Sequence, residues 1–298
     1  MIAELPLVGA GGEPVDFRRT LASHGVASLP PSRIDEEAWT LEVTLPIPRG
    51  ARTVGVASAT DGSAAVEVVG AVGARGHATL LAQLRHMFRL DEDLSPFYLV
   101  ARDDPQLAWA AAGAGRMLRS PTVFEDVVKT ICTTNCAWGG TVRMVTALVD
   151  NLGVRAPGGR RTFPSADAMA AAGEDFYRDV ARAGYRGAYL RALADDVASG
   201  VLDLEELTDP DLPVDEIEAR LLSLPGVGPY AAAHVMLTSL GRYSRLVLDS
   251  WTRPTYAKLA GRKAGDRTIE RKFRRYGDFA GLAFWLLLTR GWVPDDRA

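Results

Sequence analysis

Residues 221–259 read LLSLPGVGPYAAAHVMLTSLGRYSRLVLDSWTRPTYAKL, and this stretch predicts a helix, a glycine turn, a second helix, a loop and a third helix. Leu221, Leu222 and Leu224 form the apolar face of the first helix. The run 225–228, PGVG, interrupts it, because its two glycines permit the positive φ values of a tight turn. Pro229 suits the first position of the next helix. The turn therefore presents free backbone N–H groups at a helix N-terminus, a site suited to a phosphate.

A carboxylate follows the second helix of this stretch. Asp249 comes after the apolar run 246–248 and before residues 250–253, which places it at the first turn of the third helix. One interpretation is a helix cap, which an aspartate at a helix start commonly provides. The other is a catalytic carboxylate, and capping does not exclude it, because the helix dipole favours the ionised form.

This stretch resembles the hairpin of the helix-hairpin-helix (HhH-GPD) DNA glycosylases, which include endonuclease III and the adenine-mismatch, alkylpurine and oxoguanine enzymes. In that superfamily an LPGVG-type turn is followed by a second helix, a loop and an aspartate, which here is Asp249. Bifunctional members carry a nucleophilic lysine where this chain has Tyr230, and the separation 249 − 230 = 19 matches the family spacing. The resemblance therefore implies a monofunctional DNA glycosylase, nearest the alkylpurine and oxoguanine branches.

The resemblance implies chemistry at C1′ of a flipped nucleotide. Breaking the C1′–N bond builds positive charge on the sugar, as in glycoside hydrolysis, and Asp249 would stabilise that charge and orient the attacking water. The extruded base needs a pocket of apolar or aromatic side chains. The candidates are Trp138, Tyr230, His234 and Trp251, each of which could instead be ordinary core packing.

Contacts to DNA are expected from the hairpin and from two other places. The hairpin residues are Leu224, Gly226, Val227 and Gly228, and Arg253 follows Asp249. The run 120–153, SPTVFEDVVKTICTTNCAWGGTVRMVTALVDNLG, resembles the oxoguanine branch, as do FPSADAMA and AGYRGAYL further on. In it Asn135 coincides with the family asparagine that enters the space left by the flipped nucleotide; alternatively it is a helix-end amide. Cys136 replaces the second asparagine usual at that turn.

The pattern outside the hairpin predicts an α+β fold. Residues 1–100 form an expected β-rich antiparallel lobe, with strands at 39–45, 53–56 and 65–72 and a helix at 77–88. Residues 101–298 form the expected helical domain, with the hairpin at 221–240 and C-terminal helices beside the N-terminal lobe. Further helices are predicted at 105–112, 122–133, 141–152, 166–171, 175–183, 188–200 and 214–223.

Composition limits the possible classes of partner. The net charge of −3 and a pI near 5.9 argue against bulk electrostatic coating of nucleic acid. Basic residues concentrate in the last quarter of the chain, where they could form a local DNA-binding patch or simply a solvated helical surface. They are Arg242, Arg245, Arg253, Lys258, Arg262, Lys263, Arg267, Arg271, Lys272, Arg274 and Arg275. We expect a monomer that acts in the cytoplasm on double-stranded DNA with a damaged base, and no membrane span.

No cofactor is expected to be required. Cys132 and Cys136 are too few for an iron-sulfur cluster, and the four histidines show no ligand spacing. Members of the resembled family often hold a monovalent cation, K⁺ or Na⁺, which the carbonyls of Leu224, Pro225 and Val227 could bind here. Two other functions remain open: a non-catalytic hairpin DNA-binding module, and an oxidised-purine glycosylase with lyase activity from Lys258 or Lys263.

Overall fold

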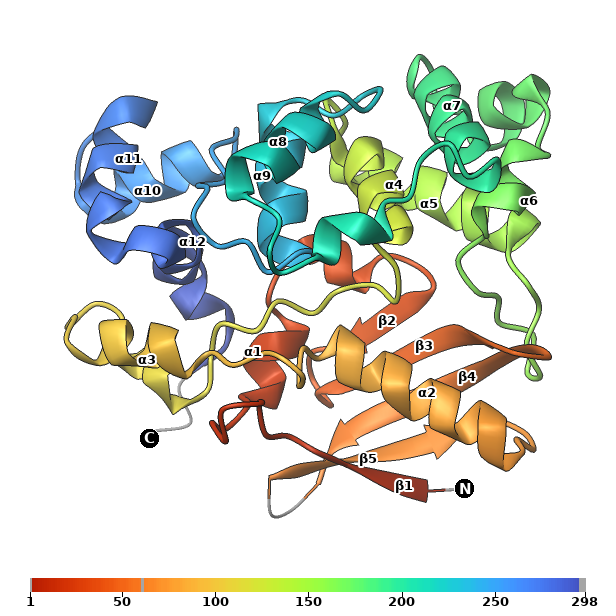
Figure 1. Cartoon of the computed structure of the whole chain (residues 1–298), viewed down its shortest axis with the longest axis horizontal. Coiled ribbons are helices and arrows are strands. Elements are labelled where there is room, and N and C mark those ends of the chain that lie inside the picture. The colour runs from red at the N-terminus through yellow and green to blue at the C-terminus, as the bar shows by residue number, and fades with distance from the viewer. Residues whose placement is uncertain (1, 60–61, 295–298) are drawn as a thin grey trace.

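The computed structural model describes residues 2–59 and 62–294, in which a sheet lobe lies beneath a broad layer of helices (Figure 1). The sheet has strand order β1-β5-β4-β3-β2, and every neighbouring pair is antiparallel. Its strands are β1 Ile2–Pro6, β2 Ser32–Asp35, β3 Thr40–Ile47, β4 Gly50–Ser58 and β5 Ser63–Val68. The expected α+β class with an antiparallel N-terminal lobe is confirmed.

The sheet buries one face against helices α1 (Phe17–Leu21) and α2 (Ala74–Met87), the second of which lies across the strands in Figure 1. Leu41, Val43 and Leu45 alternate along β3 and are fully buried. The strand expected at 65–72 ends at Val68, because the chain turns at Gly70 with φ +85°. The strand expected from residue 39 begins at residue 40, since Trp39 has φ +51°.

Ten further helices follow in the described residues. They are α3 Ser95–Arg102, α4 Val123–Thr133, α5 Trp138–Leu152, α6 Ala166–Ala170, α7 Arg186–Ala198, α8 Val214–Leu222, α9 Pro229–Thr238, α10 Thr252–Ala260, α11 Asp266–Phe273 and α12 Ala280–Thr289. Most predicted helices are confirmed, with two exceptions. The predicted helix 105–112 is only a 3-10 turn, Ala108–Ala112, and 175–183 holds a π-helical turn, Phe176–Val180.

Helix α3 has no counterpart among the predicted helices. Its N-terminus follows an Asp93 carboxylate that accepts hydrogen bonds from the Ser95 N–H and hydroxyl, and Pro96 occupies the first turn. Asp104 then accepts from the Gln106 N–H, which closes a turn where a longer helix was expected. The structure therefore has a helix at 95–102 that the sequence did not predict, and only a 3-10 turn within the predicted helix 105–112.

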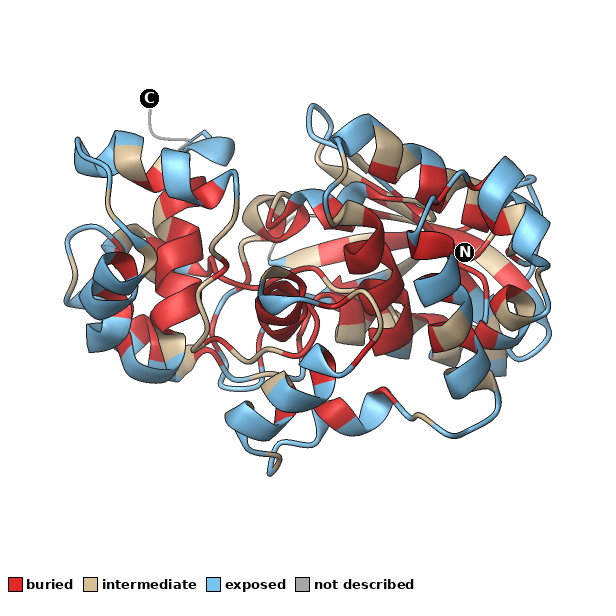
Figure 2. Cartoon of the chain, turned by 90° about the horizontal axis from the view of Figure 1, so that it is seen from above, coloured by how far each residue is buried: buried red, intermediate tan, exposed pale blue. Residues whose placement is uncertain are grey.

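Helix α9 lies at the centre of the molecule. Its residues from Ala231 to Thr238 are all buried, and they contribute to two cores. Ala232 and Val235 pack with α4, α5, α7 and α8, whereas Ala233 and Leu237 pack with α3 and the C-terminal helices α10–α12. Figure 2 shows such buried residues gathered on the inner helices, with exposed residues on the rim. The second helix of the hairpin is thus fixed on all sides.

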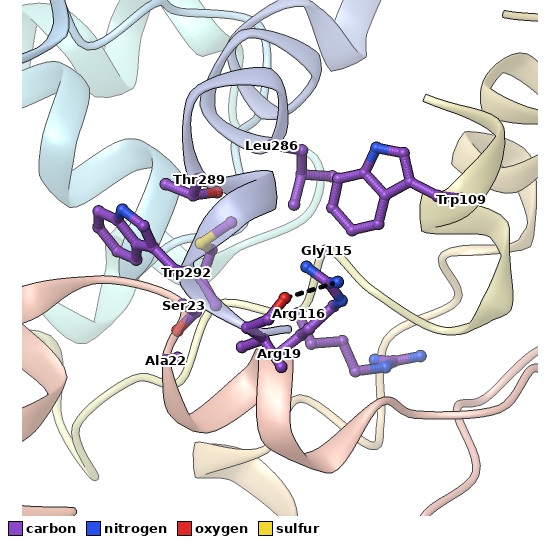
Figure 3. A pocket seen from close by; sticks show the side chains of 11 residues that line it. Arg19, Ala22, Ser23, Trp109, Gly115, Arg116, Leu286, Thr289 and Trp292 are labelled. Atoms are coloured by element: carbon purple, nitrogen blue, oxygen red, sulfur yellow. Dashed lines mark hydrogen bonds between the residues drawn. The ribbon is translucent and has the colours of Figure 1, made fainter. Parts of the chain in front are cut away.

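The C-terminal helices return to the sheet lobe. The Arg19 guanidinium on α1 donates hydrogen bonds to the carbonyls of Arg290 and Val293, and Trp285 Nε1 on α12 donates to the Ser23 carbonyl. Figure 3 shows the small cavity between these segments, lined by Arg19, Trp109, Leu286 and Trp292 among others. Its volume of about 20 Å³ leaves room for roughly one water, so this junction is packing rather than a ligand site.

Candidate active site

The hairpin turn joins α8 to α9 with only one residue in the left-handed region. Gly226 has φ +82°, and the Val227 N–H donates to the Leu224 carbonyl across the turn. The expectation that both glycines take positive φ is wrong for Gly228, which has φ −102° and ψ −175°. Gly228 is the extended residue before α9, and Pro229 takes the first position of that helix, as expected. The lack of a side chain at Gly228 leaves open space in front of the N-terminus of α9.

No side chain caps the N-terminus of α9. Apart from its two chain neighbours, no described residue has an atom within 4 Å of the place where a Cβ on Gly228 would sit. Leu224 and Val227 are buried, and their side chains pack in the helical core and anchor the turn. The first N–H groups of α9 are thus open to an anion.

Asp249 combines a cap with a free carboxylate oxygen. Its Oδ1 accepts hydrogen bonds from the N–H groups of Trp251 at 2.9 Å and Thr252 at 2.6 Å, and its own N–H donates to Thr252 Oγ1 at 2.8 Å. These paired hydrogen bonds between Asp249 and Thr252 form a capping box at the start of α10, and they hold the Asp249 side chain in one orientation. Among the described residues nothing donates to Oδ2. The half-buried carboxylate therefore keeps one oxygen for a substrate.

Asp249 lies on the wall of an open pocket of about 760 Å³ between the hairpin, the α4–α5 turn and the start of α10. The seven predicted residues outside the hairpin turn, which come from three separate segments, all line this one pocket. They are Asn135, Trp138, Tyr230, His234, Asp249, Trp251 and Arg253. The tertiary structure therefore brings together the expected carboxylate, base-pocket residues and DNA contacts.

The pocket also has residues that the sequence did not single out. Trp285 on α12 and Trp292 beyond it form an aromatic cluster with Trp251, with ring centroids 5.7 Å, 5.4 Å and 6.2 Å apart in the three pairs. Together with Trp138, four of the six tryptophans of the chain line the cavity. Trp285 lies in a continuously apolar helix, so its sequence context indicates only a core residue.

Tyr230 and His234 form the floor on α9, with ring centroids 5.8 Å apart. The Tyr230 hydroxyl lies 3.3 Å from Thr133 Oγ1, and burial raises the pKa of this phenol. Burial, reinforced by nearby His24, lowers the pKa of His234 to about 3. Both groups are therefore neutral at physiological pH, and the floor offers flat, uncharged rings.

Asn135 lies at the pocket rim in the turn between α4 and α5. It is exposed and has φ +47°, a left-handed conformation that asparagine tolerates better than most residues. The buried Arg186 holds this turn by donating to the carbonyls of Thr134 and Asn135, each at 3.0 Å. Asn135 follows the C-cap of α4, and its side-chain Nδ2 donates to the Tyr185 hydroxyl at 3.4 Å on the exposed side of this turn.

Two proteins of known or assigned activity resemble this chain in sequence. No protein-family model matches the sequence. The chain is 25% identical over 226 residues to a "Probable N-glycosylase/DNA lyase" of Methanothermobacter thermautotrophicus, covering 68% of this chain and 72% of that protein. It is 31% identical over 210 residues to "N-glycosylase/DNA lyase OGG1" of Arabidopsis thaliana, covering 63% of this chain and 55% of that protein.

Solved structures share the fold over almost the whole chain. The complex of MBOgg1 with a low-affinity DNA ligand has a TM-score of 0.74 at 21% identity, covering 98% of this chain and 95% of that one. The 3-methyladenine DNA glycosylase from Archaeoglobus fulgidus also scores 0.74, at 20% identity, covering 97% and 98%. The sequence relatives and the solved structures that share this fold are therefore DNA glycosylases, and the chain is similar to both sets.

The basic residues of the last quarter of the chain divide into two sets. Arg253 is committed to Asp266 through two hydrogen bonds of 2.8 and 3.0 Å, and Arg245 to Glu218 and Asp215. Arg275 pairs with Asp104. In contrast, seven exposed cations have no carboxylate within 4.0 Å among the described residues: Lys258, Arg262, Lys263, Arg267, Arg271, Lys272 and Arg274.

The glycosylase fold here holds few groups that could bind a metal. In residues 2–59 and 62–294 no three His, Cys, Asp or Glu side chains gather as a metal site, and Cys132 and Cys136 are both free thiols. At the hairpin, the Leu224 carbonyl accepts the Val227 N–H, whereas nothing described donates to the carbonyls of Pro225 and Val227. None of the described helices is long and apolar enough to cross a membrane.

Proposed function

We propose that this DNA N-glycosylase is monofunctional and removes an alkylated purine from double-stranded DNA in base excision repair, as a monomer in the compartment that holds the chromosome. One observation carries the proposal: the pocket beside Asp249 contains no lysine among its described lining residues, and Tyr230 stands at its floor. Without an amine nucleophile the enzyme must use water, so its product is an intact abasic site.

The aromatic lining supports an alkylated substrate. Alkylation at a ring nitrogen gives a purine a positive charge, and tryptophan attracts a cation over its ring face more strongly than tyrosine or phenylalanine does. Trp138, Trp251, Trp285 and Trp292 supply such faces, and neutral His234 adds no opposing charge. A neutral oxidised purine would gain stacking from the same residues but not the cation–π term.

Each group of residues in and around the pocket has a separate role in the proposed reaction. The hairpin amides at the start of α9 bind a backbone phosphate, and the carbonyls of Pro225 and Val227, with Leu224, suit a K⁺ or Na⁺ between hairpin and phosphate. Asn135 enters the gap that the flipped nucleotide leaves. Asp249 Oδ2 stabilises positive charge on the sugar and orients water at C1′ while Oδ1 stays hydrogen-bonded to the backbone.

A panel of duplexes tests the proposal. Each duplex carries one 3-methyladenine analogue, 7-methylguanine, 1,N6-ethenoadenine, 8-oxoguanine or normal purine, and base release is followed under single-turnover conditions. We expect the fastest release from the duplex that carries positively charged 7-methylguanine, with strand breaks only after alkali treatment. Release of 8-oxoguanine alone, or no release at all, contradicts the proposal.

The names of the two curated relatives favour one alternative, a glycosylase with lyase activity. It requires an amine that reaches C1′, and the candidates Lys258 and Lys263 lie exposed on and beyond α10, outside the pocket lining. Strand cleavage without alkali, together with a borohydride-trapped adduct lost in Lys258→Ala or Lys263→Ala, would support this alternative. A non-catalytic DNA-binding module explains neither the pocket nor the free carboxylate oxygen.

A further inference from the structure

Helix α11 and its C-cap residue, Arg274, carry a row of arginines on the solvent face. Ile269 and Phe273 are buried in the C-terminal core, four residues apart. Arg267, Arg271 and Arg274 are exposed and follow the i, i+4, i+7 spacing, which places them together on the opposite face. At 1.5 Å per residue the row spans about 10 Å, the scale of three nucleotide steps along one strand.

The charge of this row is uncompensated. Residues 258–274 hold seven Lys and Arg against two Asp and Glu, a net charge of +5, in a chain whose net charge is −3. The remaining 281 residues therefore carry −8. Neighbouring arginines are neutralised by carboxylates, as Arg245 and Arg275 are, but none of the described carboxylates reaches Arg267, Arg271 or Arg274. A concentrated positive surface on a negative protein indicates an anionic partner.

The row is continuous with the active-site pocket. Arg253 lines the pocket, and its guanidinium binds both carboxylate oxygens of Asp266, the first residue of α11. The Arg253–Asp266 ion pair therefore links the first residue of α11 to the pocket rim, and Arg267 is the next residue along the chain. Figure 1 places α10 and α11 side by side at one end of the helical layer, with α8 and α9 next to them. A duplex whose damaged nucleotide enters the pocket passes close to this row.

We propose that Arg267, Arg271 and Arg274 form a second phosphate-binding surface, which grips the duplex on one flank of the damaged nucleotide. The inference rests on the proposed function, because the duplex is the shared ligand. The arginine fork matches phosphate oxygens, and contacts of this kind add affinity without reading sequence. The surface strengthens binding to plain and damaged DNA alike and leaves the chemical step unchanged.

The test compares two triple variants with the same change of charge. Arg267→Gln, Arg271→Gln and Arg274→Gln are combined in one protein, and the control combines Arg33→Gln, Arg49→Gln and Arg75→Gln, three exposed cations of the sheet lobe. Binding to an undamaged duplex is measured over a series of salt concentrations. We expect the α11 variant to lose about 2 to 3 from the slope of log K against log salt, and at least about tenfold in affinity at 150 mM salt. The control keeps the wild-type slope.

Three results overturn the proposal. Equal losses in both triple variants mean that only net charge matters, and an unchanged slope in the α11 variant means that the row serves a different partner, such as an acidic protein. A fall in the excision rate at saturating enzyme places these arginines in the reaction itself. If the triple variant does not fold, each single variant replaces it, with an expected loss of about 0.9 in slope. A wild type that binds plain duplex but excises nothing refutes the proposed function, and the slope comparison still decides this surface.

Discussion

At the scale of single residues, Asp249 shows how a capping residue can also be a catalyst. One carboxylate oxygen is fixed by the N–H groups of Trp251 and Thr252, and the other faces the pocket. An amide keeps an oxygen that accepts from the same two N–H groups, so Asp249→Asn removes the charge without removing the cap.

We expect Asp249→Asn to lower the single-turnover excision rate at least about a hundredfold, since electrostatic stabilisation of this kind is worth ~3 kcal/mol or more. Affinity for the damaged duplex should stay largely intact, because the carboxylate acts on transition-state charge. The melting temperature, which reports the cap, should change little. A variant with near-normal excision would refute the catalytic role.

Tyr230 decides which product the enzyme leaves. The wild type should give no adduct with borohydride, because the neutral phenol cannot form a Schiff base. Tyr230→Lys should give a weak adduct, since partial burial favours the uncharged amine. It should also excise its base more slowly, because a pocket ring is lost. Gel electrophoresis of borohydride-treated complexes measures both proteins, and a strong wild-type adduct would mean that another lysine is the nucleophile.

At the scale of elements, the two hairpin glycines have different roles. Gly226 has φ +82°, and a Cβ there would lie 2.8 Å from Tyr189 Cδ2, so Gly226→Ala strains the turn. We expect it to lower the melting temperature and to weaken binding to every duplex. Gly228→Ala meets no protein atom within 4 Å and has an ordinary φ, so its stability should be unchanged.

Binding of Gly228→Ala should nevertheless weaken for plain and damaged DNA alike, because the new methyl group occupies the approach to the helix N-terminus. Thermal unfolding and fluorescence anisotropy separate the two variants. Loss of affinity for damaged DNA alone would show that the hairpin reads the lesion and not the phosphate.

At the scale of the whole molecule, α9 and its neighbours join the three cores. Arg89 at the end of α2 donates to the Thr238 carbonyl at the C-terminal end of α9, and Arg119 donates to the Ser239 carbonyl. His24 Nε2 donates to the Leu118 carbonyl, and its ring packs edge-on against His234. The sheet lobe therefore holds the helix that carries the pocket floor.

This buried histidine pair predicts a pH dependence of stability. Burial lowers the pKa of His24 to about 4 and that of His234 to about 3, from 6.5 in the unfolded chain. Below pH 6.5 the unfolded chain takes up protons that the folded protein does not, so stability falls as pH falls toward 4. The expected slope is about 1 kcal/mol per pH unit for each histidine. Urea unfolding between pH 7 and 5 measures it, and His234→Asn should remove one such contribution; an unchanged slope contradicts the assignment.

The sequence by itself determined the parts that depend on local chemistry. The PGVG turn, Pro229 at the start of α9, Asp249 before α10 and the alternating strand of Leu41 to Leu45 follow from backbone preferences and periodicity, which act over a few residues. The helix at 95–102 was missed because it has only eight residues and no side-chain N-cap, so the usual sequence signal of a helix start is absent.

Only the tertiary structure decided the rest, because it depends on which distant segments meet. In sequence, Trp285 and Trp292 resemble core residues. In the structure α12 packs beside α10, so both tryptophans contact Trp251 and line the pocket. Gly226 and Gly228 look alike in sequence, and only their different φ angles and the position of Tyr189 separate their roles. The basic C-terminal quarter likewise divides into paired and unpaired arginines once the carboxylates of other segments, such as Glu218 and Asp104, come within reach.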